Sequence, residues 1–203
     1  PTPICYDMGE AKKFITDPVE LRKVQLRDES VFLRFPRIIT RQDSISLRGT
    51  IDVDCYYHTN SIHSTFIRAA ECPYDLYFLL ALINSKLLSY YHLSLALKGP
   101  DLHPQVLVTN LPKLPIRRIN FTTLQKERKQ LLEQGKALYQ EYLQSQDWDK
   151  VLTFVAQRLP QKPDGAPDME HEQLDVVHDL LAFLVEEMTR LNKEKQSRIK
   201  GFL

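Results

Sequence analysis

Residues 73–97, PYDLYFLLALINSKLLSYYHLSLAL, are the densest apolar stretch of this sequence and decide its fold. Large apolar side chains recur there at spacings of three and four residues, as on one face of a helix: Leu76, Leu79, Leu80, Ile83, Leu87, Tyr90 and Tyr91. Pro73 suits the start of a helix and Gly99-Pro100 its end. Interspersed Asn, Ser, Lys and His residues exclude a membrane span. We therefore predict one long, largely buried helix from Pro73 to Leu97.

The residues before this helix predict a β-sheet. Residues 31–68 are rich in Phe, Ile, Val, Tyr and Thr with polar residues between them, which favours strands joined by tight turns. The expected strands cover 31–35, 37–40, 50–54 and 63–67, with turns at Gly49 and Asn60-Ser61, and a further short strand covers 105–109. A short helix opens at Asp17-Pro18 and runs to about Asp28. The predicted class is α+β, a twisted, mainly antiparallel sheet packed on the long helix.

The last third of the chain predicts helices. Residues 111–115, LPKLP, form an extended segment that cannot be helical, and we place a domain boundary after Ile119, which gives domains 1–119 and 120–203. Helices are expected from a capping box at Thr122 and Gln125 to about Gln146, and over 149–158, followed by a loop over 160–168. A last helix carries an apolar stripe with the spacing of a helix that packs against a partner: Leu174, Val177, Leu181, Leu184, Met188 and Leu191.

Composition indicates a globular protein of a reducing compartment. The chain has 203 residues, 43% of them hydrophobic and 26% charged. Its odd number of cysteines, Cys5, Cys55 and Cys72, has no metal-binding spacing and argues against a secreted disulfide framework, so we expect a cytoplasmic location. The sequence begins Pro1-Thr2-Pro3, and we expect it to be a fragment of a longer protein.

A search for catalytic motifs finds little. The sequence has no glycine-rich phosphate loop, GxSxG or HExxH motif. Asp52 and Asp54 could hold the divalent ion of a nuclease, with Glu71 as the nearest further acid, but alternate acids on a strand more often face solvent. His58, His63 and His178 are better explained as surface or structural residues than as general bases. The cysteines are expected to be small buried groups.

Basic and aromatic residues gather in the first half. Residues 1–119 hold 15 Lys and Arg against 12 Asp and Glu, whereas 120–203 hold 12 against 14. Residues 31–48 contain four arginines, Arg34, Arg37, Arg41 and Arg48, and one acid, Asp43, an excess that favours a phosphate backbone. Residues 56–61, YYHTNS, combine rings, an amide and hydroxyls, the groups that read base edges, although a strand followed by a turn has the same composition.

Two motifs in order resemble a known family. The segment FLLALINSKLLSYY at 78–91, followed by NLPKLPI at 110–116, is similar to the Asn-Ser-Lys helix and proline exit of the TaqI-like C-terminal specificity domain. The segments PRIITR at 36–41 and YYHTN at 56–60 resemble two strands of the same family. The exit here continues into Arg117 instead of a second proline. Residues 120–203 resemble, less closely, a helical region that follows this domain in some members.

The resemblance implies a division of labour. In restriction-modification enzymes with an adenine-specific methyltransferase, a separate domain binds S-adenosylmethionine and methylates a flipped adenine with an Asn-Pro-Pro-Tyr motif, which this sequence lacks. The specificity domain docks on double-stranded DNA and selects the sequence. The chain itself is therefore expected to have no catalytic residues, bound metal or cofactor, and its partners to be DNA and the methyltransferase domain of the same protein.

Candidate DNA contacts follow from these expectations. The first set is Arg34, Arg37, Arg41 and Arg48; the second is Tyr57, His58, Asn60 and Ser61; the third, along the DNA backbone, is Lys98, Lys113, Arg117 and Arg118. Asn84, Ser85 and Lys86 are interpreted as structural, because an amide and a hydroxyl in a buried helix usually fix a neighbouring loop. Two alternatives remain, a protein-docking scaffold that uses the 174–191 stripe and a metal-dependent nuclease that uses Asp52 and Asp54.

Overall fold

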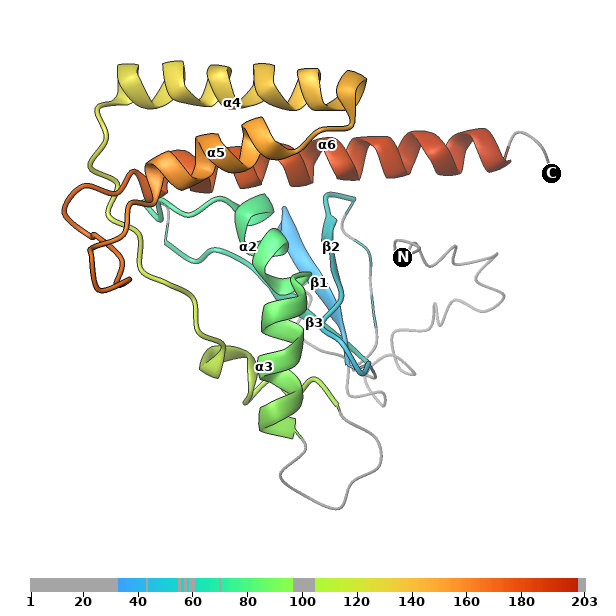
Figure 1. The fold of residues 1–203 in the computed structure, drawn as a ribbon. Coiled ribbons are helices and arrows are strands. Elements are labelled where there is room, and N and C mark those ends of the chain that lie inside the picture. Colours follow the sequence, from blue (N-terminus) through green and yellow to red (C-terminus); the bar gives the residue numbers. More distant parts are fainter. Residues whose placement is uncertain are drawn as a thin grey trace, which may run out of the picture. The chain divides into compact units, whose positions relative to one another are not determined.

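A computed structural model of the chain describes residues 33–42, 44–54, 56, 58, 61–69, 71–96 and 105–200 (Figure 1). The helix expected over 18–28 and the first two residues of the strand expected over 31–35 lie outside the described residues, as do Cys5 and Cys55. The chain divides into two compact units. Unit 1 comprises Pro1–Cys72 and Ile83–Leu114, and unit 2 comprises Pro73–Leu82 and Pro115–Leu203.

The sheet of unit 1 has three antiparallel strands. They are β1 (Arg37–Arg41), β2 (Gly49–Asp52) and β3 (Ile62–Thr65), in the spatial order β2-β1-β3. Isoleucine and threonine in each strand suit a pleated sheet. With the helices, this sheet confirms the predicted α+β class. Gly49 lies in β2 and pairs with Thr40, so the turn expected at this glycine is wrong.

The strand register divides the side chains of the sheet between two faces. Because successive side chains alternate, Ile38 and Thr40 share one face with His63, which pairs with Thr40. All three are buried, and the ring Nε2 of His63 lies 2.6 Å from the carbonyl oxygen of Val106. The opposite face carries Arg37, Ile39 and Arg41 and is partly open, since Ile39 is half-buried and Arg41 is exposed. We call this second face the arginine face.

The long helix predicted over 73–97 is two helices. These are α2 (Leu76–Ile83) and α3 (Lys86–Ala96), separated at Asn84 and Ser85. The amide of Asn84 bonds both backbone groups of Gly49, accepting from its N–H at 2.8 Å and donating to its carbonyl at 3.0 Å. The hydroxyl of Ser85 accepts the N–H of Leu88 at 3.1 Å and so begins α3 as an N-cap. Asn84 and Ser85 therefore have the structural role expected of them, and they also end α2.

Two local predictions near the end of unit 1 are wrong. Residues 111–115 include a 3₁₀ helix, η2 (Leu111–Lys113), because Pro112 occupies the first turn, where a fixed φ and a missing N–H are tolerated. The chain becomes extended only at Leu114. Residues 105–109 form no strand. Gln105 is an isolated bridge residue, and the N–H of Val106 donates to the carbonyl of Gln42 at 2.8 Å beside the sheet.

Unit 2 contains three longer helices, α4 (Gln125–Ser145), α5 (Asp149–Arg158) and α6 (Leu174–Lys200) (Figure 1). Their shared core holds Phe154, Val176 and Leu180. Gly135 of α4 is buried where an added Cβ would lie 3.1 Å from Leu180 and 3.3 Å from Phe154, so α4 approaches its neighbours closely there. The predicted C-terminal end of α4 and both ends of α5 agree with the structure, and the loop predicted over 160–168 lies within the longer connection between α5 and α6.

Two details of unit 2 differ from prediction. No capping box opens α4, because its N-cap is Leu124, and the neighbouring Thr123 donates its N–H and its hydroxyl to the carboxylate of Asp175. The buried face of α6 is wider than the predicted stripe, since Val176 and Leu180 are buried together with Val177, whereas Met188 is exposed. Spacing alone defines the predicted stripe, whereas the packing of both α4 and α5 against α6 widens its buried face.

Candidate nucleic-acid interface

Arg41 and Arg48 lie opposite each other at one end of the sheet. The N–H of Arg41 donates to the carbonyl of Arg48 at 3.2 Å, which continues the β1–β2 ladder beyond the pair of Thr40 and Gly49. Both side chains are exposed, and Arg48 Nε lies 3.1 Å from the hydroxyl of Ser46. Within the described part of the chain, neither guanidinium has a carboxylate partner. Like charges on facing positions repel each other, so an anion bound between them would be stabilised.

A second pair of arginines lies at the other end of the sheet. The guanidinium carbons of Arg34 and Arg68 lie 5.1 Å and 5.9 Å from the ring centroid of Phe66, and both side chains are exposed. Phe66 directly follows Thr65, which pairs with Ile38, so this group belongs to the end of the sheet where β1 begins. Arg68 and Phe66 were not among the residues predicted from sequence. The sequence feature that could have indicated them is an arginine two positions after a phenylalanine at the end of a strand.

Polar side chains lie between these two groups on the arginine face. Thr50 and Ser64 flank Ile39 from the two outer strands, because each pairs with it. The Nε2 atom of His58 lies 2.7 Å from the hydroxyl of Ser64, so His58 is held against this face by a hydrogen bond. Hydroxyl and imidazole groups can both donate and accept hydrogen bonds. The face therefore offers hydrogen-bonding groups flanked by two pairs of arginines.

Arg37 also belongs to this face but is buried beneath it. Its Nε donates to Asp52 Oδ2 at 2.8 Å, its Nη2 lies 2.6 Å from the same oxygen, and neither side chain is exposed. Nη2 also donates to the carbonyl of Tyr56 at 2.5 Å. An arginine in such a pair cannot reach DNA without leaving a buried carboxylate unpaired. We therefore assign Arg37 to the support of the sheet, which corrects its selection as a DNA contact from sequence.

The other residues predicted from sequence have different environments. Tyr57, Asn60 and Lys98 lie outside the described residues. Ser61 is exposed, and its carbonyl accepts the N–H of Gln42 at 2.9 Å. Lys113 is an exposed residue of η2. Arg117 and Arg118 belong to unit 2, where Arg117 pairs with Glu172 at 2.5 Å and Arg118 is exposed. The structure therefore brings together only part of the predicted set.

The carboxylates proposed for a nuclease are not arranged as metal ligands. Asp52 is paired with Arg37 and also accepts the backbone N–H groups of Asp54 and Tyr56. A metal ion at Asp52 would compete with the guanidinium for the same oxygen atoms. Across the described residues, no three His, Cys, Asp or Glu side chains form a group suited to a metal ion. The nuclease alternative thus loses the geometry on which it depended.

His178 of unit 2 is a structural histidine, as expected. Its Nε2 accepts the N–H of Asp75 at 3.0 Å and its Nδ1 lies 2.8 Å from Asp179 Oδ1, so both ring nitrogens are used and the ring is buried. Arg128 forms a bidentate pair with the same carboxylate. Burial would raise the pKa of Asp179, but hydrogen bonds from His178 and Arg128 outweigh it and lower that pKa below its ordinary value.

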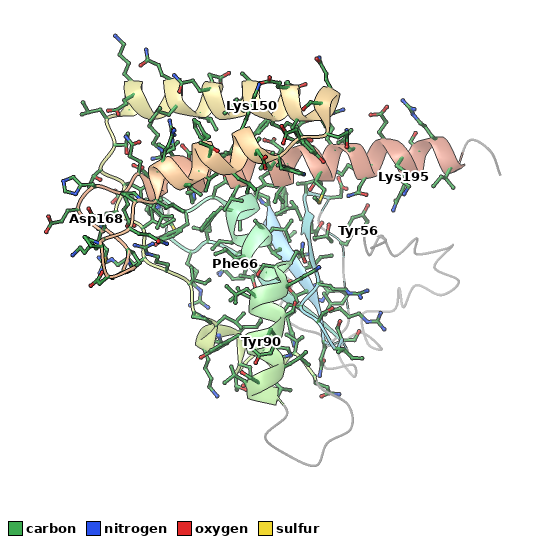
Figure 2. The ribbon with its side chains drawn as sticks, viewed as in Figure 1. Tyr56, Phe66, Tyr90, Lys150, Asp168 and Lys195 are labelled. Carbon is green, nitrogen blue, oxygen red and sulfur yellow. The ribbon has the colours of Figure 1, made fainter. Side chains whose placement is uncertain are left out.

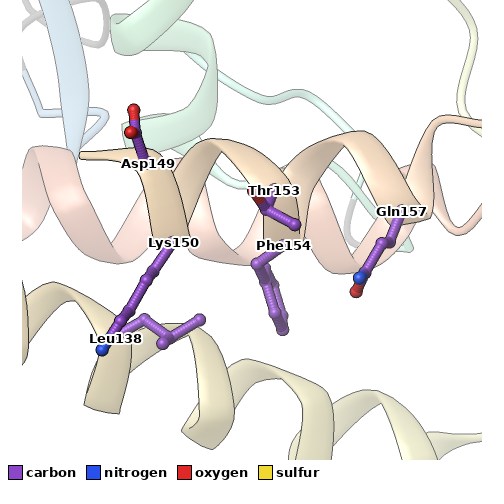
Figure 3. A pocket seen from close by; sticks show the side chains of 6 residues that line it. All are labelled: Leu138, Asp149, Lys150, Thr153, Phe154 and Gln157. Carbon is purple, nitrogen blue, oxygen red and sulfur yellow. The ribbon is translucent and has the colours of Figure 1, made fainter.

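A hollow between α4 and α5 is a feature of unit 2 that could hold a ligand. It has a volume of about 320 Å³ and is lined by Leu138 of α4 and by residues of α5 that include Lys150 and Phe154 (Figure 3). Phe154 points toward α4 in this view, as a core residue would. Lys150 is engaged with Glu141. The hollow is open to solvent instead of enclosed, so we assign no ligand to it.

The comparison with known families decides the identity of the region that contains the sheet. The sequence model of the family named TaqI-like C-terminal specificity domain matches residues 6–116, more than half of the chain. The chain belongs to this family. The TaqI-like domain is a DNA sequence-specificity module of a restriction-modification system, which confirms the resemblance seen in the sequence. No curated protein and no solved structure matches the chain.

One further observation concerns membranes. Among the helices of the described residues, none combines the length and the apolar character that a membrane span requires.

Proposed function

We propose that the TaqI-like domain selects DNA sequences for an adenine-specific type II restriction-modification methyltransferase in the cytoplasm. In this proposal the methyl donor S-adenosylmethionine and the target adenine are bound by a separate catalytic domain, and this chain contributes target choice without catalysis. Membership of the family supports target choice, and the absence of an Asn-Pro-Pro-Tyr motif from the sequence supports the separate catalytic domain.

The observation that carries the proposal is the pair of arginine groups at the two ends of the arginine face. Arg37 and Arg41 mark those ends, and four residue steps of a strand span about 13 Å. The major groove of B-DNA is about 12 Å wide. A face of this length can cross the groove with Arg41 and Arg48 near one phosphate backbone and Arg34 and Arg68 near the other. Arginine suits this role because its planar fork matches a phosphate.

Sequence choice then depends on the polar side chains between the arginines. Phosphate contacts supply affinity and register but carry no direct sequence information, whereas groups that reach base edges discriminate between sequences. Thr50, Ser64 and His58 occupy this middle position on the arginine face. A hydrogen bond between a side chain and a base edge that is broken by the wrong base pair changes the binding free energy by about 1–3 kcal/mol.

The test is selection from a pool of random duplex DNA at two salt concentrations, followed by sequencing of the bound fraction. We expect an enriched motif and affinity that falls steeply as salt rises. Salt-sensitive binding without enrichment would show contacts to the DNA backbone but would contradict sequence selection by this chain. Absence of binding at low salt would contradict the proposal.

A second candidate function, protein docking through α6, is favoured by the part of its apolar stripe that stays exposed. Met188 and Leu191 have exposed fractions of 62% and 43%, although α4 and α5 cover the earlier part of the helix. Exposed apolar side chains in a row suit a protein contact. Sedimentation analysis of the chain and of Met188→Glu tests this candidate, since docking between copies would give a dimer that the substitution dissociates.

A further inference from the structure

We propose that Tyr56 is a specificity-determining DNA contact and that the buried pair of Arg37 and Asp52 is the device that positions it. This inference rests on the proposed function and deepens it. The sequence alone favours the neighbouring Tyr57 as the candidate contact, and the structure adds Tyr56.

Both backbone polar groups of Tyr56 are bound by the buried ion pair. Its N–H donates to Asp52, with distances of 3.2 Å to Oδ2 and 3.4 Å to Oδ1, and its carbonyl accepts from Arg37 Nη2 at 2.5 Å. Asp52 also accepts the N–H of Asp54 at 3.1 Å. The charged pair therefore fixes the backbone at Tyr56 from two sides.

The ring of Tyr56 is nevertheless accessible. Its exposed fraction is 51%, and its hydroxyl lies 3.4 Å from Asp54 Oδ2. Figure 2 labels this side chain beside the sheet. Here the backbone is rigidly held while the ring remains exposed, the arrangement expected of a contact that is positioned before its ligand arrives.

The nature of the ion pair supports a positioning role. Replacing a buried ion pair by well-packed apolar residues is often neutral or stabilising, so such a pair is weak evidence for stability as its purpose. Apolar residues could not hold Tyr56 in this way. The carboxylate accepts a hydrogen bond from the backbone N–H of Tyr56, and the guanidinium donates one to its carbonyl. Because the register of β1 and β2 places Arg37 opposite Asp52, the ion pair forms there and holds Tyr56 in a defined position.

The position fits a base contact. Tyr56 lies at the Arg37 end of the sheet, the end that also carries Arg34 and Arg68 near Phe66. If these arginines bind a phosphate backbone, an exposed ring at the same end of the sheet would be close to the groove beside that backbone. A tyrosine side chain loses little conformational freedom on binding. Its apolar edge can contact the 5-methyl group of thymine in the major groove.

The experiment measures the affinity of the full 203-residue chain for its selected DNA sequence and for random duplex DNA at one salt concentration. We expect Tyr56→Ala to weaken binding to the selected sequence by about 5- to 100-fold and binding to random DNA by no more than about twofold. Tyr56→Phe should retain most of the selectivity, because the ring remains. Tyr90→Ala, which removes an exposed tyrosine of α3, is the matched control and should change neither affinity.

A double-mutant cycle tests the positioning role of Arg37. Arg37→Lys keeps the charge but cannot reproduce the fork that joins Asp52 to Tyr56, so it should also reduce affinity for the selected sequence while random-DNA affinity stays unchanged. In a Tyr56→Ala background, Arg37→Lys should have little further effect on the ratio of the two affinities. A merely structural role for Arg37 would give the same loss of that ratio in both backgrounds.

The outcomes separate this inference from the proposed function. A wild-type chain that selects no sequence would overturn the proposed function and, with it, the inference. A wild-type chain that selects a sequence, with Tyr56→Ala equal to it on both DNAs, would overturn the inference alone. An equal loss on both DNAs would also overturn it, because Tyr56 would then contact the backbone or support the fold instead of selecting bases.

Discussion

Arg37 faces Asp52 directly across β1 and β2, and the two buried side chains lie 2.6 Å apart at their closest charged atoms. Removing one member of such a pair leaves an uncompensated charge in the interior. We expect Arg37→Ala to lower the free energy of unfolding by about 3–5 kcal/mol, measured by chemical denaturation. Arg41→Ala, on the same face but exposed, should change it by less than about 0.5 kcal/mol.

Replacing both members of the pair by apolar residues tests whether the unpaired charge causes the loss of stability. The double variant Arg37→Met with Asp52→Leu should recover part of the stability lost in Arg37→Ala, because no charge is left unpaired. Recovery should be incomplete, since the N–H groups of Asp54 and Tyr56 lose their acceptor. A double variant less stable than Arg37→Ala would contradict this account of the pair.

The connection between α2 and α3 depends on one amide. Asn84 makes two hydrogen bonds to the backbone of Gly49, so Asn84→Ala should lower the free energy of unfolding by about 1–2 kcal/mol. Lys86→Ala, two residues further on at the start of α3, is the control and should have little effect. An unaltered urea midpoint in Asn84→Ala would show that these bonds contribute nothing to stability.

Close packing at Gly135 limits what can replace it. Gly135→Ala should be nearly neutral, because a gain of about 1 kcal/mol in helix propensity offsets the crowding against Leu180 and Phe154. Gly135→Leu should destabilise the chain by about 1–3 kcal/mol, since its larger side chain must displace the core. Thermal unfolding of both variants measures the difference. Equal stability of Gly135→Leu and the wild type would mean that the core is loosely packed here.

The carboxylate of Asp179 should make unit 2 sensitive to acid. Its pKa is lowered in the folded chain, so its contribution to stability is present above the ordinary pKa of an aspartate and is lost as the pH falls below about 4. Asp179→Asn should therefore show a weaker decrease of the urea midpoint between pH values of about 6 and about 3 than the wild type. Asp164→Asn, in the exposed loop after α5, should follow the wild-type curve.

Local features of the fold were predictable from sequence. The ends of α5 at Asp149 and Arg158 follow from helical periodicity between two turn segments, signals that need no knowledge of the rest of the chain. The break at Asn84 is not predictable in this way, because helical spacing continues across it. What interrupts the helix is a pair of bonds to Gly49, 35 residues earlier, and a local pattern does not contain that contact.

The candidate site was predictable only in part, for a related reason. Arg37 and Arg41 are alike in the sequence, four residues apart on one strand, yet one is buried and the other exposed. The difference comes from the residue opposite each of them, Asp52 for Arg37 and Arg48 for Arg41, and that depends on the strand register. Likewise, the Tyr-Tyr sequence could not indicate that the Arg37–Asp52 pair would bind the backbone of Tyr56.

The central claim, that Arg41 and Arg48 bind a DNA phosphate at the end of the sheet, is tested most directly by the salt dependence of DNA binding. Plots of log affinity against log salt should be shallower for Arg41→Ala and for Arg48→Ala than for the wild type, by about 0.9 for each phosphate that is no longer neutralised. Lys150→Ala, which removes an exposed cation of unit 2, should leave the slope unchanged. Equal slopes for the wild type and both arginine variants would contradict the claim.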